Sequence, residues 1–394
     1  MRAGCMSRFA ALRLNMSSLR TFFLTALCLS SFHLMACDTA SDDRSVTTGE
    51  DMNEATGDDL SDATVDLRSI QDATRDPDES LIDTSPNPGI ENPFDRQMVG
   101  LQTDREVLHD GQVRRFHFFA PDQTDDQASY PLVILLHGHG GSVDQLLGLN
   151  NRKAPYKIWL DVAAREKIFI LLPEGVISPD DKLGWNDCRG DTMTNPSTDD
   201  VGFIVELAEA MTQTYPIDAK RIYASGTSNG GHMSFRLAIE AGDTFAAIAP
   251  IVASLPKNSK CSSPTEAVAL LLVNGTDDPI LPYHGGFMAG GRGEVLSTAE
   301  TLGFWKDINQ NTASAVTETL PNINTADDST VIQTTYAGDT SIQDVILLTM
   351  DGAGHAEPSI AEEYSSVFEA IVGRQNHDVE MAERVWSFFQ DKSK

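Results

Sequence analysis

Short, continuous apolar runs bounded by turn residues recur along this chain from about residue 96 onward. The clearest span residues 131–137, 168–173, 221–225, 267–273 and 344–350. They are rich in branched side chains and do not alternate apolar with polar positions, which is typical of strands buried on both faces of a sheet. The runs therefore predict the interior strands of a parallel sheet.

Helical patterns separate these runs. Between residues 199 and 214, apolar side chains recur on one helix face, and acids at the start suit the helix dipole. Similar patterns cover residues 231–240 and 381–390. Strands that alternate with helices predict an α/β fold, in which an open and mostly parallel sheet carries helices on both faces.

The first 37 residues have the pattern of an export signal. Residues 16–37 place one arginine before an apolar run that is too short to span a bilayer comfortably. Their ending, LMAC, resembles the lipobox of bacterial lipoproteins, in which the cysteine (here Cys37) carries the lipid. The alternative is an ordinary cleaved signal, and Met16 competes with Met1 as the start. We expect an exported protein, either anchored to a membrane by lipid or free in the periplasm or medium.

The segment that follows is strongly acidic. Residues 38–95 carry 17 acids and three arginines and are rich in Asp, Ser, Thr and Gly. Such a composition buries too little apolar surface to offset chain entropy, so we expect a disordered linker, with residues 96–394 as the folded domain. The whole chain has a net charge of −29, which repels phosphate backbones and argues against a nucleic-acid partner.

A G-x-S-x-G sequence occupies residues 226–230. It follows the apolar run at 221–225 and precedes the helical pattern at 231–240, which is the strand–turn–helix setting that a nucleophile elbow requires. The glycines keep the tight turn free of steric cover and expose the hydroxyl of Ser228. The sequence therefore predicts Ser228 as a nucleophile, with a plain glycine-rich turn as the alternative.

A second glycine-rich sequence, HGHGG at residues 137–141, directly follows another apolar run. Its glycines allow backbone N–H groups to face a carbonyl oxygen. With the amide of Asn229, the amide of His139 is expected to form an oxyanion hole. We expect His137 to support this loop rather than to titrate during catalysis.

A serine nucleophile needs a base and an acid that orients it, and in such folds they follow the serine in the order acid, histidine. The loop NGTDDP, at the end of an apolar run, offers Asp277 and Asp278. His284, His355 and His377 remain as possible bases. His355 closes the flexible sequence DGAGH after the last apolar run, so we predict it as the general base.

These residues predict ester hydrolysis through an acyl-enzyme. His355 takes the proton of Ser228 as the serine attacks the carbonyl, and the amides of His139 and Asn229 meet the oxyanion. His355 then protonates the leaving alcohol, and water reverses the steps.

Eight segments between residues 135 and 355 resemble, in order, secreted polyhydroxybutyrate depolymerase-type esterases, which are close to feruloyl and acetylxylan esterases. They are LLHGHGGS, LLPEG, GWNDCRG, DDVGFI, RIYASGTSNGGHMSFRLA, FAAIAP, NGTDDPILPYHGG and GAGH. The resemblance implies the α/β-hydrolase fold and a serine carboxylester hydrolase that needs no cofactor or metal. It also implies an ester substrate: aromatic or acetyl esters on polysaccharide, or hydroxyalkanoate esters.

The same resemblance bears on individual residues. The family pattern places the catalytic acid immediately before proline, which selects Asp278 over Asp277. It also suggests that Trp185, Asn186 and Tyr283 lie near the substrate cleft.

Two positions depart from the family pattern. His139 stands where relatives often have a cysteine or an aliphatic residue, and residues 356–358, Ala-Glu-Pro, follow the histidine where relatives often show an aromatic residue. An acid near the mouth of the cleft is expected to weaken the binding of negatively charged esters.

Five cysteines occur in the chain. Cys5 and Cys28 leave with the signal, and Cys37 carries the lipid, so Cys188 and Cys261 remain. An exported protein meets an oxidising compartment, where we expect these two to form a disulfide.

Two other functions compete with the esterase. One is a surface-anchored binding lipoprotein whose hydrolase fold is vestigial, against which the intact catalytic set argues. The other is a serine peptidase on the same fold, for which no propeller or prolyl-pocket segment is visible.

Overall fold

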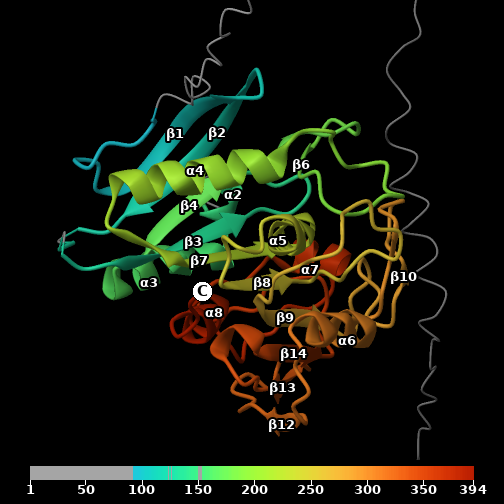
Figure 1. The fold of residues 1–394 in the computed structure, drawn as a ribbon. Coiled ribbons are helices and arrows are strands. Elements are labelled where there is room, and N and C mark those ends of the chain that lie inside the picture. Colours follow the sequence, from blue (N-terminus) through green and yellow to red (C-terminus); the bar gives the residue numbers. More distant parts are fainter. Residues whose placement is uncertain (1–91, 123, 126, 150–152) are drawn as a thin grey trace, which may run out of the picture. The chain divides into compact units, whose positions relative to one another are not determined.

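Ten strands of the computed structural model form one sheet, in the order β1-β2-β4-β3-β7-β8-β9-β14-β13-β12 (Figure 1). The structure describes residues 92–122, 124–125, 127–149 and 153–394. The predicted signal, the lipid site Cys37 and nearly all of the predicted linker lie outside the described residues.

The six central strands run parallel to one another. They are β4 (Phe169–Pro173), β3 (Tyr130–Leu136), β7 (Ile217–Thr227), β8 (Ala247–Ile251), β9 (Ala269–Gly275) and β14 (Val345–Asp351). Most of their side chains are buried, which explains the continuous apolar runs of the sequence. The predicted mostly parallel α/β sheet is confirmed.

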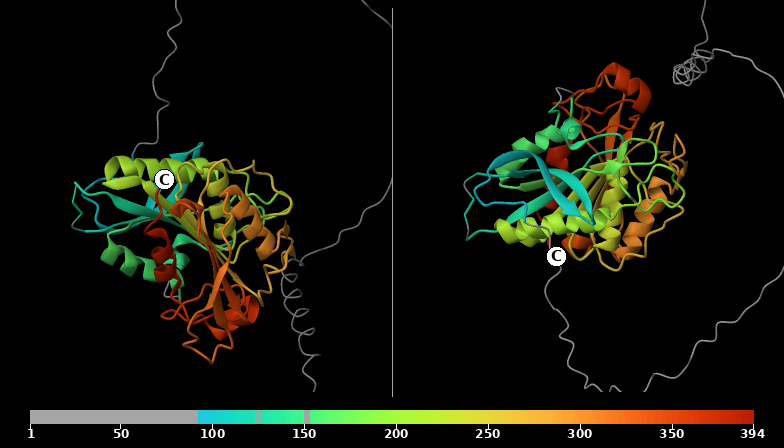
Figure 2. Two further views of the ribbon diagram at one scale, coloured as in Figure 1. Left: turned by 60° about the horizontal axis from the view of Figure 1, so that its bottom comes forward. Right: turned by 90° about the horizontal axis from the view of Figure 1, so that it is seen from above.

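Antiparallel strands extend the sheet at both edges. β1 (Gly100–His109) and β2 (Gln112–Ala120) form a hairpin beside β4, and β13 (Thr330–Tyr336) and β12 (Val316–Thr319) follow β14. Figure 2 shows the blue hairpin and the orange strands at opposite ends of the sheet. Most positions of β1 and all of β12 are partly or fully exposed, so these strands lack the apolar runs by which the interior strands were predicted.

Helices cover both faces of the sheet, as predicted. One apolar core joins a face of the sheet to α4 (Asp200–Thr214), α5 (Asn229–Glu240) and α6 (Thr298–Ile308). A second core joins the other face to α2 (Val143–Leu146), α3 (Ile158–Glu166) and α8 (Met381–Phe389). Successive side chains of β3 alternate between the two cores, as the pleat requires.

Short elements complete the described chain. They are η2 (Pro155–Lys157), β5 (Val176–Ile177), β6 (Leu183–Gly184), β10 (Gly286–Phe287), β11 (Glu294–Val295), η3 (Ser341–Gln343) and α7 (Ser366–Val372). No helix of the described residues is both long and apolar enough to cross a bilayer.

The packed domain begins earlier than the predicted boundary at residue 96. Phe94 is 7% exposed, and its ring centroid lies 5.5 Å from that of Phe116 and 4.9 Å from that of Phe118. Arg105 also donates a hydrogen bond to the carbonyl of Pro93. A single aromatic residue inside an acidic, polar stretch gives little local signal, and its burial depends on β2.

Cys188 and Cys261 are joined by a disulfide, with their Cα atoms 5.2 Å apart. Cys188 lies in the segment between β6 and α4, and Cys261 lies in the segment between β8 and β9. The bond thereby ties together two loops that are 73 residues apart in the chain.

Replacing both cysteines by alanine is expected to lower the free energy of unfolding by roughly 4 kcal/mol, because a loop of this length restricts the unfolded chain strongly. Urea unfolding of the oxidised protein and of the double variant measures the difference. Wild-type protein under reductant should unfold like the double variant. Coincident unfolding curves for oxidised and reduced wild type would contradict the expectation.

Candidate active site

Ser228 lies at a sharp turn between β7 and α5. Its backbone has φ 53° and ψ −115°, a strained conformation for any residue with a side chain. A Cβ on Gly226 would lie 2.5 Å from the backbone of Gly230, and a Cβ on Gly230 would overlap the carbonyl oxygen of Leu136. Only glycine fits on either side, so the turn holds the serine half-exposed at the end of β7.

The predicted base and the predicted acid are in direct contact. His355 Nδ1 lies 2.6 Å from Asp278 Oδ2, and the Asp278 side chain is fully buried. The other oxygen, Oδ1, accepts the N–H groups of Ile280 at 2.7 Å and Leu281 at 2.8 Å. These bonds fix the carboxylate, which in turn holds the proton on Nδ1 and leaves Nε2 able to accept one. Asp277 is exposed instead, so the structure brings His355 to Asp278.

All three groups follow parallel strands of one sheet. Ser228 follows β7, Asp278 follows β9 and His355 follows β14, so they meet at the carboxyl edge of the sheet. Within the described chain, no hydrogen bond joins Ser228 to His355. Such bonds are often long without substrate and tighten when it binds.

The loop 137–141 lies beside Ser228. A Cβ on Gly138 would lie 3.6 Å from the Cβ of Ser228. The amides of Gly140 and Gly141 donate to Leu183 and Gly138, whereas that of His139 has no acceptor among the described residues. The amide of Asn229, in the first turn of α5, has no acceptor within its helix either. Both predicted oxyanion-hole amides are therefore free to donate.

The His137 and His139 side chains hold the loop in place. Nδ1 of His137 donates to the carbonyl of Gly138 at 2.8 Å, and Nε2 accepts the N–H of Gly175 at 3.0 Å. This pairing requires the neutral ring, and burial lowers its pKa. Nε2 of His139 lies 2.9 Å from Asp180 Oδ2. His137 thus supports the loop, as expected.

The predicted cleft residues are placed differently. Trp185 is fully buried and donates from Nε1 to the carbonyl of His137 at 2.9 Å, so it does not line the cleft. The side-chain amide of Asn186 donates a hydrogen bond to the carbonyl oxygen of Thr198, 2.6 Å away. The Tyr283 hydroxyl lies 2.9 Å from that of Thr349 in β14. Trp185 therefore packs beneath the loop and not in the cleft lining, and the other two residues have structural partners.

A buried ion pair that the sequence analysis missed lies under the elbow. Arg189 Nη2 is 2.6 Å from Asp187 Oδ2, and both side chains are buried. The same oxygen accepts Asn229 Nδ2 at 2.7 Å, while Asn229 Oδ1 accepts the N–H of Trp185 at 2.7 Å. Burial alone would raise the Asp187 pKa, but the Arg189 guanidinium outweighs it and holds that pKa far below its usual range. The network fixes the loop 185–190 against the start of α5. In the sequence, the only indication of this ion pair was the two opposite charges on either side of Cys188.

His232 is also buried, one turn after Ser228 in α5. Burial, with a smaller contribution from the Arg189 guanidinium, lowers its pKa to about 3. His232 is therefore neutral at pH 7.

Stability is expected to fall in acid because His232 is buried in its neutral form. Below pH 6.5 the unfolded chain binds a proton at this histidine, whereas the native chain does not until about pH 3. The free energy of unfolding should therefore rise with pH across this window, by up to about 1.4 kcal/mol per pH unit for this one group. Urea unfolding at pH 4, 5, 6 and 7 measures the slope. The His232→Gln variant should show a shallower slope, and an equal slope would contradict the assignment.

A cleft of about 450 Å³ opens beside the elbow. Its lining comes from three segments, 137–146, 153–156 and 357–368. The lining includes Gly138, next to Ser228, and Glu357, two residues after His355, but not Ser228, Asp278 or His355 themselves. The volume lies within the range of about 300–1,000 Å³ that is usual for small-molecule sites.

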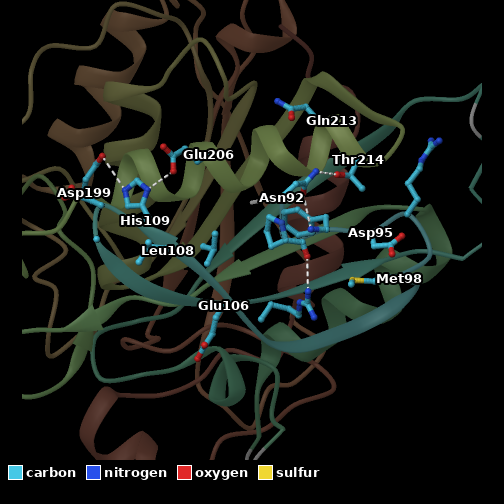
Figure 3. Close-up of a pocket in the computed structure, with 17 residues that line it drawn as sticks. Asn92, Asp95, Met98, Glu106, Leu108, His109, Asp199, Glu206, Gln213 and Thr214 are labelled. Carbon is cyan, nitrogen blue, oxygen red and sulfur yellow. Dashed lines mark hydrogen bonds and ion pairs between the residues drawn. The ribbon is translucent and has the colours of Figure 1, made fainter. Parts of the chain in front are cut away.

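A larger hollow of about 1410 Å³ lies elsewhere, between β1 and α4. Figure 3 shows His109 in it, 2.7 Å from Glu206 and 3.7 Å from Asp199. Unlike the smaller cleft, this hollow has no residue of the loop 137–141 in its lining, so size alone does not identify the active site. Among the described residues, no group of three or more His, Cys, Asp or Glu side chains is arranged to hold a metal.

Comparison with known proteins agrees with the esterase motifs. No family model matches the chain. The chain is 27% identical over 309 residues to a protein named as an esterase, NocK from Nocardia uniformis subsp. tsuyamanensis. The alignment covers 75% of this chain and 85% of that protein. It is 27% identical over 173 residues to feruloyl esterase C of Emericella nidulans, covering 44% of this chain and 58% of that protein. The predicted resemblance to esterases and feruloyl esterases is confirmed.

Among solved structures, acetyl xylan esterase from Aspergillus awamori aligns with a TM-score of 0.46 and 14% identity. The alignment covers 74% of this chain and 99% of that one.

Proposed function

We propose that this carboxylic ester hydrolase of the α/β-hydrolase fold works through an acyl-enzyme on Ser228. The observation that carries the proposal is the 2.6 Å contact of His355 with buried Asp278, at the sheet edge where the strained elbow presents Ser228. A strained serine, a fixed imidazole and free amides at one edge of a sheet suit acyl transfer.

The reaction follows from this arrangement. Ser228 Oγ attacks the carbonyl carbon of the ester while His355 Nε2 takes its proton, and Asp278 stabilises the resulting imidazolium. The amides of His139 and Asn229 donate to the oxyanion, each supplying about 3 kcal/mol of transition-state stabilisation. Collapse of the intermediate expels the alcohol, which receives the proton from His355. Water, activated by the same imidazole, then releases the acid and restores the serine.

The substrate belongs to one of two groups of esters. These are aromatic or acetyl esters on plant polysaccharide and short hydroxyalkanoate esters. The relative named feruloyl esterase C supports the first group, and the resemblance of the motifs to polyhydroxybutyrate depolymerase-type esterases supports the second.

A substrate panel tests the function. The purified mature protein is assayed with methyl ferulate, acetylated xylan, p-nitrophenyl acetate and hydroxybutyrate oligomers. We expect hydrolysis of at least one and labelling by a fluorophosphonate probe. Neither hydrolysis nor labelling would favour the alternative of a binding lipoprotein with a vestigial fold.

We further propose that the protein is exported and held at a membrane by lipid on Cys37. The LMAC sequence after the short apolar run supports this. The Cys37→Ser variant should either be released in soluble form or persist as an uncleaved precursor, whereas wild type should partition with membranes through its acyl chains. Fractionation and detergent phase partitioning, read by immunoblot, measure the difference. Equal release of both proteins into the medium would leave only an ordinary cleaved signal.

A further inference from the structure

One wall of the cleft carries a buried carboxylate. Glu357 is 7% exposed and belongs to the residues that line the cleft. Tyr364, which lines the same wall, donates from its hydroxyl to Glu357 Oε2 at 2.7 Å. The backbone oxygen of Glu357 accepts Gln375 Nε2 at 2.8 Å, so both ends of the residue are held in place.

The other carboxylate oxygen, Oε1, is left open. Within the described part of the chain it has no hydrogen-bond partner, and it is not one of the buried polar atoms that are sealed from solvent. No Lys, Arg or His of that part pairs with Glu357. Lys153, in the cleft wall, and Lys157 instead lie 3.8 and 3.9 Å from the carboxylate of Glu362.

A carboxylate that is mostly removed from water needs hydrogen-bond donors, and each missing donor costs free energy. Here the described residues supply one donor, to Oε2, while Oε1 keeps some exposed surface and the residue lines a space of substrate size. The lining of that space also includes the apolar side chains of Leu146, Pro155 and Phe368, which can contact a substrate but cannot orient its polar groups. The Glu357 carboxylate is thus a group able to orient a polar substituent.

We propose that Glu357 accepts a hydrogen bond from a hydroxyl of the substrate and so selects neutral, hydroxylated esters over esters that bear a carboxylate. This inference rests on the proposed esterase function. A hydroxyl donates to Oε1 without bringing a charge, whereas a second carboxylate in the same cleft is repelled by the charge of Glu357. The hydroxyl has two sources, the acyl group or the sugar that carries it, and both offer the same chemistry.

The test compares matched esters. For the acyl source, p-nitrophenyl 3-hydroxybutyrate is set against p-nitrophenyl butyrate. For the alcohol source, methyl xyloside monoacetate is set against cyclohexyl acetate, whose ring lacks hydroxyls. The p-nitrophenyl hemiester of succinic acid reports on carboxylate exclusion. The readout is the ratio of kcat/KM values within each pair, which cancels any general loss of activity.

The variant is Glu357→Gln, which keeps an acceptor for Tyr364 but removes the charge. We expect the hydroxyl preference to fall about tenfold in one or both pairs, as for the loss of a charge-assisted hydrogen bond. Discrimination against the succinate ester should fall about fivefold. The control is Glu363→Gln, which makes the same change of charge at an exposed position outside the cleft and should leave every ratio unchanged.

Each result has one meaning. A fall in the kcat/KM ratio of either pair supports the role of Glu357 and identifies the source of the hydroxyl. Unchanged ratios in a variant that still hydrolyses p-nitrophenyl acetate overturn it and leave the esterase function standing. If the variant does not fold, the wild-type ratios decide, and no preference for the hydroxylated member of either pair overturns the inference. No hydrolysis of any ester by wild type removes the proposed function and this inference with it.

Discussion

Replacing Ser228 by alanine is expected to lower kcat/KM for p-nitrophenyl acetate by about 10⁴-fold or more. The hydroxyl is the proposed nucleophile, and neither the oxyanion amides nor the base could substitute for it. The free energy of unfolding should change by less than about 1 kcal/mol, because the side chain is half-exposed and alanine has the same Cβ in the strained turn. Initial rates, fluorophosphonate labelling and urea unfolding measure the three effects.

A matched control lies in the same helix. Ser234 donates its hydroxyl to the carbonyl of Gly230 at 3.0 Å and is fully buried. The Ser234→Ala variant should keep its labelling and lose some stability. Undiminished labelling in Ser228→Ala would assign the reactive serine elsewhere.

The second large effect distinguishes two adjacent acids. Asp278→Asn is expected to lower kcat by about 10³–10⁴-fold. An amide in place of the carboxylate presents an N–H or a weaker acceptor to His355 Nδ1, which disfavours the tautomer that leaves Nε2 free. The exposed neighbour should matter little, so Asp277→Asn should change kcat by less than about threefold.

Steady-state kinetics of the two variants provide the comparison, since each replaces one carboxylate by an amide of the same shape. Thermal unfolding of both checks that the loop survives, because Asp278 also accepts the amides of Ile280 and Leu281. The opposite order of effects would transfer the role of the acid to Asp277.

Much of the fold could be predicted because burial on both faces makes a strand continuously apolar. The runs at 131–137, 168–173 and 267–273 correspond to β3, β4 and β9, within one or two residues at each end. The edge strands β1 and β12 carry polar side chains and were missed, because only pairing with a neighbouring strand stabilises them. Their position is a property of the assembled sheet.

The candidate site divides in the same way. The glycine spacing around Ser228 and the order of acid and histidine are local patterns, so they are visible in the chain. The complete burial of Trp185 could not be predicted, because an aromatic residue in a loop shows no local sign of which side it will face. The role of Asp187 and Arg189 was invisible, since it depends on the approach of the Asn229 side chain from another element.

The sequence by itself determined the class of chemistry, the order of the strands along the chain and the elbow at Ser228, because these follow from spacing along the backbone. The residues alone left Asp277 and Asp278 both open as the acid, and only the tertiary structure brings His355 to Asp278 and the two predicted disulfide partners within bonding distance. Those partners are 77 and 73 residues apart, and their distances depend on how the parallel strands align at one edge of the sheet. Only the folded chain also turned Glu357, one acid among many, into a buried carboxylate in the cleft wall, with one oxygen that has no hydrogen-bond partner among the described residues.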